Sequence, residues 1–384
     1  MLLFRKKKQE ARPLIVAAPD KFKGTLTARE VAAVVKRVIA DVMPTAQVRV
    51  CPMADGGEGT ARVLAGSMNL DSVTEYIPDA LGHSTPAEYF TDGKTVALDS
   101  SAVVGLQRIG PERRDPMRSS TYPLGELLVR LINEGAEQIY LGIGGTATVD
   151  GGAGLLQALG VQFYDFSGRE MPSPIRACDL ADIFSAEFPA GVHDIVRRIV
   201  TGLADVDVPL EGSMDYAPQK GVTQEQMPQL RHALANYQQV IDEALHAPGA
   251  PTPWAGAGGG LGYALGRVLG CGMRSGAETV LDTYRLFDSG QGAPELIITG
   301  EGCLDRQTLA GKVVWRICCE ATARDIPVLV LAGHVELDDI PDKIMVMATD
   351  RFLNGQELNR ARAVRSLDTA ARQALAEICV RLWG

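Results

Sequence analysis

Short apolar runs alternate with an amphipathic segment at the start of the chain. Residues 14–19 are apolar and suit a buried strand. Residues 27–42 then place apolar side chains at helical spacing, with Thr27 as N-cap and Glu30 at the third helical position, as in a capping box. Residues 48–53 are expected to form a second strand. This order predicts βαβ units of a parallel sheet, where ligands gather at the carboxyl ends of strands.

The middle of the chain has a different pattern. From about residue 66 to residue 106, short alternating stretches separated by turn signals suit an antiparallel β module. Beyond it we expect helices over residues 124–133, 154–159, 227–247 and 367–382. We expect strands over residues 138–143, 161–164, 296–299, 328–331 and 343–348, and a partial strand within 195–203.

These changes of pattern predict a discontinuous domain with an insertion. We expect residues 13–65 and 295–384 to form a parallel α/β domain, and residues 66–294 to form an inserted α/β domain. Residues 1–12 open with a basic run that no apolar signal region follows, so they are expected to form a flexible tail.

Composition and charge narrow the class of protein. The 384 residues suffice for two domains, and 46% hydrophobic with 22% charged residues is typical of a globular protein. The net charge of −9 argues against general binding to nucleic acid or anionic membranes. The seven cysteines contain no C-x-x-C pair, which favours reduced thiols over disulfides or zinc. We therefore expect a soluble cytoplasmic protein, as a monomer or homodimer, with a small-molecule substrate.

Glycine-rich loops lie at the ends of several expected strands. Glycine lets the backbone approach a phosphate closely, and a helix N-terminus behind the loop adds partial positive charge. Each loop alone also fits a tight turn or close helix packing, but several of them beside acidic residues favour phosphate binding. The candidate nucleotide-binding residues are Gly144, Gly145, Thr146, Gly258, Gly259, Gly260 and Gly300.

Carboxylates follow two of the expected strands. Glu301 and Asp305 come after the strand at 296–299 and suit Mg²⁺, which prefers oxygen ligands and substrate phosphates. Asp205 and Asp207 stand two residues apart after an apolar run. On a strand both would point the same way, as a metal site or a general base. Turn chemistry before the next proline is the alternative for this pair.

Cations accompany these acids. Lys312 could neutralise a transferring phosphoryl group, although a solvated surface lysine is the alternative. Lys21 and Lys23 follow the first strand, where they could hold a substrate carboxylate. The candidate substrate-binding residues at this edge are Asp20, Lys21, Asp55 and Glu58. We expect these loops, although distant in sequence, to converge on one cleft.

Standard nucleotide motifs are largely missing. The chain has no G-x-x-x-x-G-K-[ST] and no H-R-D or D-F-G, which excludes a P-loop enzyme and a protein kinase. Residues 142–147 do fit G-x-G-x-x-A after an expected strand, with Asp165 further on. An NAD(P)-dependent oxidoreductase is therefore an alternative, although residues 150–152 interrupt the position where its helix would run.

Taken together, these segments resemble the type 1 glycerate kinase family over nearly the whole chain. The motifs that carry the resemblance, with the family's pattern in parentheses, are residues 18–26 APDKFKGTL (APDSFKGSL), 52–60 PMADGGEGT (the same), 142–154 GIGGTATVDGGAG (GIGGSATNDGGAG), 218–221 PQKG (the same), 256–262 GAGGGLG (the same) and 299–312 TGEGCLDRQTLAGK (TGEGRLDGQTLRGK).

The resemblance implies a kinase with two α/β domains: a flavodoxin-like, Rossmann-related parallel domain and an inserted swivelling β/β/α-type domain. It also implies ATP, Mg²⁺ and D-glycerate, with phosphoglycerate as the product. Phosphoryl transfer needs mainly positioning and charge neutralisation. Combining the matched positions with that chemistry, we expect Asp205, Lys23 and Lys312 to be catalytic and Asp207, Glu301 and Asp305 to bind the metal.

Four of the departures from the family's pattern replace a polar residue that is expected at the site. A serine is expected at Lys21, asparagines at Val149 and Val208, and an arginine at Cys303. Loops that meet phosphate or substrate would lose hydrogen-bond donors at these positions, although Lys21 adds a cation. A paralogue with altered substrate or lost catalysis, acting as a ligand-binding protein, is therefore a further alternative.

Overall fold

The computed structural model describes residues 12–246, 252–288, 290, 292–309, 312–337, 340–341, 343–353 and 357–382. The chain divides into two compact units, which we call the first unit (Met1–Met53 and Tyr284–Gly384) and the second unit (Ala54–Thr283). The predicted boundary after residue 65 falls inside helix α2 (Thr60–Met68) instead. The expected N-terminal tail lies outside the described residues, apart from Arg12.

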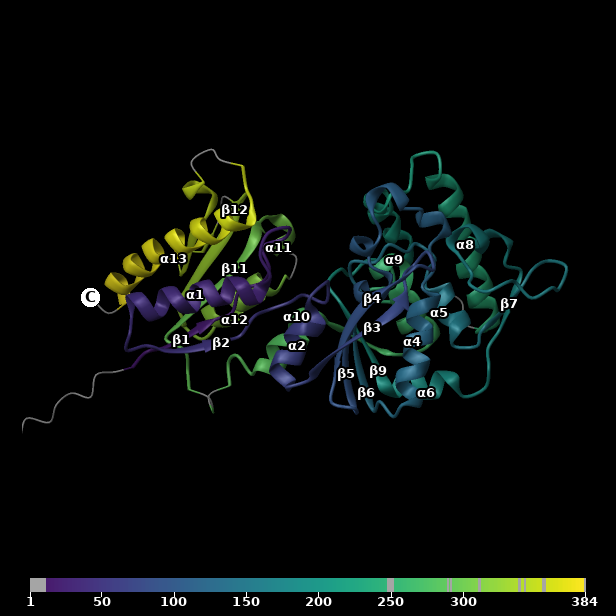
Figure 1. Ribbon diagram of the computed structural model, residues 1–384, viewed down its shortest axis with the longest axis horizontal. Coiled ribbons are helices and arrows are strands. Elements are labelled where there is room, and N and C mark those ends of the chain that lie inside the picture. The colour runs from purple at the N-terminus through teal and green to yellow at the C-terminus, as the bar shows by residue number, and fades with distance from the viewer. Residues whose placement is uncertain are drawn as a thin grey trace, which may run out of the picture. The chain divides into compact units, whose positions relative to one another are not determined.

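A five-stranded parallel sheet forms the centre of the first unit, in the order β13-β12-β11-β1-β2 (Figure 1). Its strands are β1 (Leu14–Ala17), β2 (Gln47–Val50), β11 (Leu296–Leu304), β12 (Val328–Val335) and β13 (Ile344–Ala348). Its helices are α1 (Ala28–Val42), α11 (Arg306–Leu309), α12 (Val313–Thr322) and α13 (Arg360–Leu382). The predicted α/β class with a parallel sheet is confirmed.

Both faces of this sheet are covered, as its uninterrupted apolar strands require. Ile15 and Ala17 belong to a core shared with α1 and α13, whereas Val16, on the opposite face, is equally buried. Helices α1 and α13 lie side by side in Figure 1, and Arg37 and Arg372 pair with Asp368 and Asp41 between them.

Helix α1 begins as the sequence predicts. Glu30 N donates to Thr27 Oγ1 at 3.3 Å, and Thr27 N donates to Glu30 Oε2 at 2.8 Å, which completes the capping box. Seven apolar residues of one face are buried: Ala28, Val31, Ala32, Val34, Val35, Val38 and Ile39.

Strands β11 and β12 are longer than predicted. Both continue past the apolar runs at 296–299 and 328–331, because Cys303 and Leu304 remain in register with His334 and Val335. Polar residues do not end a strand whose neighbour keeps supplying hydrogen-bond partners. Glu301 therefore belongs to a strand, not to a loop.

The second unit contains a six-stranded mixed sheet in the order β10-β9-β6-β5-β4-β3. Its strands are β3 (Asp71–Pro78), β4 (Ser84–Thr91), β5 (Thr95–Asp99), β6 (Gln138–Gly142), β9 (Val200–Ala204) and β10 (Gly272–Ser275). β3 and β4 are antiparallel to their neighbours, as predicted, whereas β5, β6, β9 and β10 are parallel. The antiparallel module is thus continuous with a parallel sheet.

Helices surround this sheet. The larger ones are α2, α4 (Tyr122–Asn133), α5 (Ala153–Ala158), α6 (Val192–Ile199), α8 (Met227–Ala244), α9 (Ala257–Gly262) and α10 (Gly276–Tyr284), with shorter α3 (Ser101–Val104) and α7 (Ala217–Lys220). The partial strand expected within residues 195–203 is β9, which begins at Val200, and residues 195–199 form the end of α6. The strand at 161–164 is β7 (Gln162–Tyr164), which pairs with β8 (Ser185–Glu187) in a two-stranded sheet separate from the main one.

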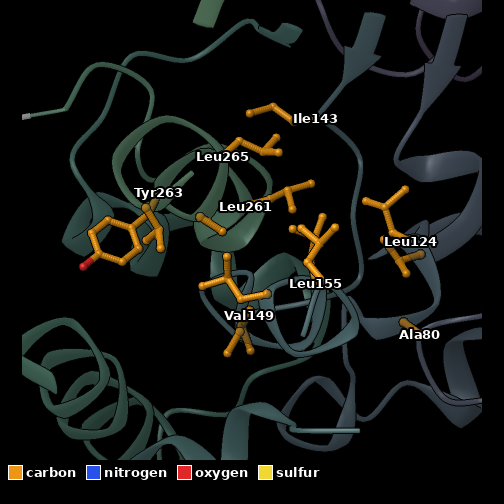
Figure 2. Close-up of a cluster of buried hydrophobic side chains, with 14 of the residues drawn as sticks. Ala80, Leu124, Ile143, Val149, Leu155, Leu261, Tyr263 and Leu265 are labelled. Atoms are coloured by element: carbon orange, nitrogen blue, oxygen red, sulfur yellow. The ribbon is translucent and has the colours of Figure 1, made fainter. Parts of the chain in front are cut away.

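The core of the second unit lies directly beneath its glycine-rich loops. Figure 2 shows Val149 among buried side chains that include Leu155, Leu261 and Tyr263. Val149 is 2% exposed. The expectation that this position is a polar site is therefore wrong: its side chain is part of the hydrophobic core.

Candidate functional site

In the first unit, the loop after β1 lies against β11. Asp20 N donates to Gly300 O at 2.8 Å, and a Cβ on Gly302 would lie 3.0 Å from Lys23 N. Asp20 is buried, with Oδ1 accepting from Lys21 N at 2.6 Å. The sheet therefore brings the Asp20–Lys23 segment to the same edge as Glu301.

Glu301 and Asp305 share one ammonium group. Lys312 Nζ lies 3.5 Å from Glu301 Oε2 and 3.7 Å from Asp305 Oδ1. Thr308 fixes Asp305, because its N–H donates to Asp305 Oδ1 at 3.0 Å while Asp305 N donates to Thr308 Oγ1 at 3.1 Å. The predicted trio of Glu301, Asp305 and Lys312 is thus assembled within this unit.

The environment of Glu301 differs from that of Asp305. Glu301 is 5% exposed, and its Oε1 has no hydrogen-bond partner among the described residues. Burial raises the pKa of Glu301, and the nearby Lys312 ammonium opposes that rise. A buried carboxylate oxygen without a donor suits coordination to a cation.

Within the described ranges, no group of three or more His, Cys, Asp or Glu side chains is arranged to hold a metal ion. Glu301 and Asp305 supply two carboxylates in the first unit, whereas Asp207 belongs to the second. Two carboxylates are compatible with Mg²⁺, which retains waters and binds substrate phosphates in place of a full protein cage.

In the second unit, the loop at 54–59 lies at the carboxyl ends of β5, β6 and β9. Gly144 N donates to Gly56 O at 3.4 Å, and a Cβ on Gly56 would lie 2.8 Å from the carbonyl carbon of Ala204. Asp99 accepts from Gly59 N and Ala61 N at 2.8 and 2.9 Å.

Asp55 and Glu58 therefore belong to the second unit, which corrects their expected place on the sheet edge of Asp20. Asp55 Oδ1 accepts from Gly57 N at 3.1 Å, and Glu58 Oε2 accepts from Gln107 Nε2. The chain crosses from one unit to the other just before this loop, a transition that the βαβ pattern did not reveal.

Asp205 and Asp207 follow β9 but are not on a strand. β9 ends at Ala204, and both aspartates are exposed. Asp207 Oδ1 accepts from Trp254 N at 2.8 Å, so its carboxylate stabilises the turn before α9 through this hydrogen bond. The argument from strand alternation was wrong for this pair, although Asp205 still lies at the carboxyl end of a parallel strand.

The loops at 142–154 and 256–262 pack against each other. Gly151 N donates to Gly259 O at 3.1 Å, and Thr146 Oγ1 donates to Gly258 O at 2.8 Å. Gly258, Gly259 and Gly260 all have positive φ, and a Cβ on Gly259 would lie 2.0 Å from Thr148 O. Close packing of the two loops, which was the alternative to phosphate binding, thus explains why these positions are occupied by glycine.

The same packing explains Gly144 and Gly300. A Cβ on Gly144 would lie 2.8 Å from Gly57 Cα, and one on Gly300 would lie 2.1 Å from Leu331 O. Gly145 has a φ of +76°, and a Cβ there would lie 3.2 Å from Ser101 Cβ, a less severe contact. These close contacts account for the glycines without a ligand.

The sequence reasoning assigned no role to two buried charged groups between these loops. Asp150 is fully buried and accepts from Thr121 N, Thr121 Oγ1, Gly152 N and Gly154 N at 2.7, 2.8, 3.3 and 3.3 Å. Lys220 Nζ donates to Thr146 Oγ1 at 3.1 Å and to Thr148 O at 2.8 Å. A charged residue beside glycine, in PQKG at residues 218–221 and in DGG at residues 150–152, was the sequence feature that could have indicated both groups.

The other departures from the family's pattern are less buried than Val149. Val208, Cys303 and Lys21 are each half-buried. Val208 O accepts from Gly256 N at 2.9 Å, so this residue joins the loop after β9 to the loop before α9. Burial raises the pKa of the Cys303 thiol, which is therefore neutral at physiological pH.

The dinucleotide-binding alternative does not fit this topology. The fingerprint requires the strand after the glycine-loop helix to join the same parallel sheet. β7 instead pairs with β8 in a separate two-stranded sheet. Asp165 lies in a tight exposed turn, accepting from Ser167 N at 2.8 Å and pairing with Arg169.

The fold and its candidate sites define an α/β protein with acidic, lysine-bearing and glycine-rich loops at the carboxyl ends of parallel strands. Comparison with known proteins then identifies the family. The glycerate kinase family model matches residues 15–380, and the chain belongs to the glycerate kinase family.

Its similarity to individual relatives extends over most of each chain. It is 35% identical to a glycerate kinase of Halalkalibacterium halodurans, over 84% of this chain and 85% of that protein. It is 35% identical to a glycerate 2-kinase of Escherichia coli K12, over 85% of this chain and 86% of that one. A Salmonella typhimurium LT2 protein assigned as glycerate kinase 2 has a crystal structure with a TM-score of 0.78 and 30% identity, covering 96% of this chain and 99% of that chain.

Among the described residues, no helix combines the length and apolar character that crossing a bilayer requires.

Proposed function

We propose that this chain transfers the γ-phosphoryl group of ATP to a hydroxyl group of D-glycerate, giving phosphoglycerate and ADP. Membership of the glycerate kinase family supports this assignment. The observation that carries it is the Glu301–Lys312–Asp305 group, in which one ammonium lies within 4 Å of two carboxylates, one in the C-terminal part of β11 and one just after it. Phosphoryl transfer depends on this type of charge arrangement and on positioning.

We assign the roles as follows. Asp205 accepts the proton of the attacking glycerate hydroxyl as that oxygen bonds to the γ-phosphorus, and the bond from phosphorus to the bridging oxygen of ADP breaks. Lys312 and Lys23 neutralise charge that develops on the phosphoryl oxygens and the leaving group. Asp20, Lys21, Asp55 and Glu58 are the candidate substrate contacts, and the backbone of the glycine-rich loops holds the nucleotide.

Glu301 and Asp305 are the proposed Mg²⁺ ligands. The Oε1 of Glu301, which has no hydrogen-bond partner in the described part of the chain, and the oriented Asp305 carboxylate fit this cation's preference for oxygen. Mg²⁺, when bound, neutralises phosphate charge. We assign no metal to Asp207, since its carboxylate ties the turn at Trp254.

The test is ADP release from Mg·ATP with D-glycerate as acceptor, compared with other small hydroxy acids. We expect turnover with D-glycerate that requires the divalent ion. Folded protein that releases no ADP with any acceptor, yet is stabilised by nucleotide in a melting experiment, would favour the ligand-binding paralogue. In that case the departures from the family's pattern at Val208 and Cys303 would be the first explanation for the missing kinase activity.

A further inference from the structure

Lys220 is a buried lysine to which the proposed chemistry gives no role. It ends helix α7, and the next residue, Gly221, has a φ of +109° that turns the chain away. Lys220 is 6% exposed. Lysine is rarely buried this deeply without a specific partner, because removing an ammonium from water is unfavourable.

The partners of Lys220 are the two glycine-rich loops. Its Nζ donates to Thr146 Oγ1 at 3.1 Å and to Thr148 O at 2.8 Å, both in the loop at 142–154. The Thr146 hydroxyl in turn donates to Gly258 O at 2.8 Å, in the loop at 256–262. The ammonium thus reaches both loops, one directly and one through a single hydroxyl.

The second loop is also in steric contact with the ammonium. A Cβ on Gly259 would lie 2.7 Å from Lys220 Nζ and 2.0 Å from Thr148 O, and the backbone oxygen excludes a side chain at this position. Gly258, Gly259 and Gly260 have φ values of +64°, +73° and +91°, left-handed conformations that glycine adopts without strain but is not confined to, because it lacks a Cβ. Lys220 and the loop at 142–154 pack against these residues and restrict them to this arrangement.

Asp150 offsets part of the cost of burying the Lys220 ammonium. Burial lowers the pKa of Lys220 to about 8, and the attraction of Asp150 opposes that shift. Burial in turn raises the pKa of Asp150. Tyr237, which packs against Gly151, has its pKa raised by burial and is neutral.

We propose that Lys220 is a positioning residue that holds the two glycine-rich loops in the one arrangement that binds nucleotide, without contacting the nucleotide itself. The inference rests on the proposed function, which places ATP at these loops. It predicts that loss of the Lys220 hydrogen bonds weakens nucleotide binding selectively. A residue that merely stabilised the fold would lower the fraction of active enzyme and leave KM for ATP unchanged.

The test compares Lys220→Met, which keeps length and apolar volume, with the control Lys94→Met, an exposed lysine of the same unit paired with Glu137. We expect Lys220→Met to raise KM for ATP about 10-fold or more. The variant loses two hydrogen bonds made by a charged group, and the loss of one such bond changes an equilibrium constant about 10-fold or more. We expect KM for glycerate to change less than about 3-fold. Lys94→Met should leave both constants unchanged.

If Lys220→Met does not fold, Thr146→Val carries the test, because valine keeps the shape of threonine and removes the bridging hydroxyl. We expect it also to raise KM for ATP, and Thr146→Ser to raise it less. Unchanged KM for ATP in the folded variants would overturn the inference.

Titration of ADP by calorimetry separates this inference from the proposed function. If the wild type binds ADP but phosphorylates no glycerate, the proposed activity fails, while a weaker Kd for ADP in the variants still supports the role of Lys220. An unchanged Kd overturns that role. If the wild type binds no ADP, both proposals are overturned.

Discussion

Lys312 Nζ lies 3.5 Å from Oε2 of Glu301, a carboxylate that is almost entirely buried in the C-terminal part of β11. The ammonium is half-buried and also lies near Asp305. Lysine in this position both compensates the buried acid and remains accessible to a phosphoryl group. The role proposed for Lys312 therefore depends on its charge, not on its packing.

Lys312→Met is expected to lower kcat about 100-fold or more, because a preorganised charge that stabilises the transition state is removed. Steady-state ADP release measures this change. The matched control is Lys343→Met, which removes an exposed lysine of the same unit paired with Asp325. Equal activity of the two variants would remove Lys312 from the chemistry.

Asp205 and Asp207 should respond differently to the same substitution. Asp205→Asn is expected to lower kcat about 100-fold or more with an unchanged Tm, because asparagine cannot accept the hydroxyl proton. Asp207→Asn keeps an oxygen that can accept from Trp254 N, so its kcat should change little. A large loss in Asp207→Asn and none in Asp205→Asn would show that the two roles had been assigned the wrong way round.

Val149 tests whether departures from the family's pattern reflect lost catalysis. Val149→Asn restores the expected residue but buries an amide in the core of Figure 2. We expect it to lower the free energy of unfolding by about 1–3 kcal/mol, measured by chemical denaturation, without raising kcat. Val208→Asn, at a half-buried position, is the comparison and should cost less. A gain in kcat for Val149→Asn would contradict this account.

Part of the site was predictable from sequence because it depends on local rules. The capping box at Thr27 and the acids at the ends of apolar runs follow from local chemistry. Glu301, Asp305 and Lys312 were expected as functional groups on that basis, and the structure brings these three together in the first unit.

Other features depend on partners distant in sequence, which composition and periodicity do not reveal. The extension of β11 to Leu304 depends on β12, more than twenty residues away in the chain. The glycines at 258–260 are fixed by contacts with 143–151, and Lys220 by Thr146 and Thr148. Val149 has the sequence context of a ligand loop but the surroundings of a core residue, and only tertiary packing distinguishes the two.

The pH dependence of stability tests the buried state of Lys220. Its pKa is lowered to about 8, whereas lysine in an unfolded chain titrates at about 10.4. Between these values the unfolded state binds a proton that the folded state does not, so stability rises with pH. Below about pH 8 both states are protonated, and this contribution is constant.

The free energy of unfolding of the wild type, minus that of Lys220→Met, should therefore rise from pH 8 to pH 10 by up to about 1.4 kcal/mol per unit. Urea denaturation at several pH values measures it. A difference that stays flat over this range would mean that Lys220 titrates as a solvated lysine and is not buried as described.

The most direct test of the central claim is ³¹P NMR of purified protein incubated with Mg·ATP and D-glycerate. The account predicts a new phosphomonoester resonance of phosphoglycerate, growing in step with ADP, and its near absence with Lys312→Met and Asp205→Asn. Folded wild-type protein that leaves ATP and glycerate unchanged, or variants that form product as fast as the wild type, would contradict it.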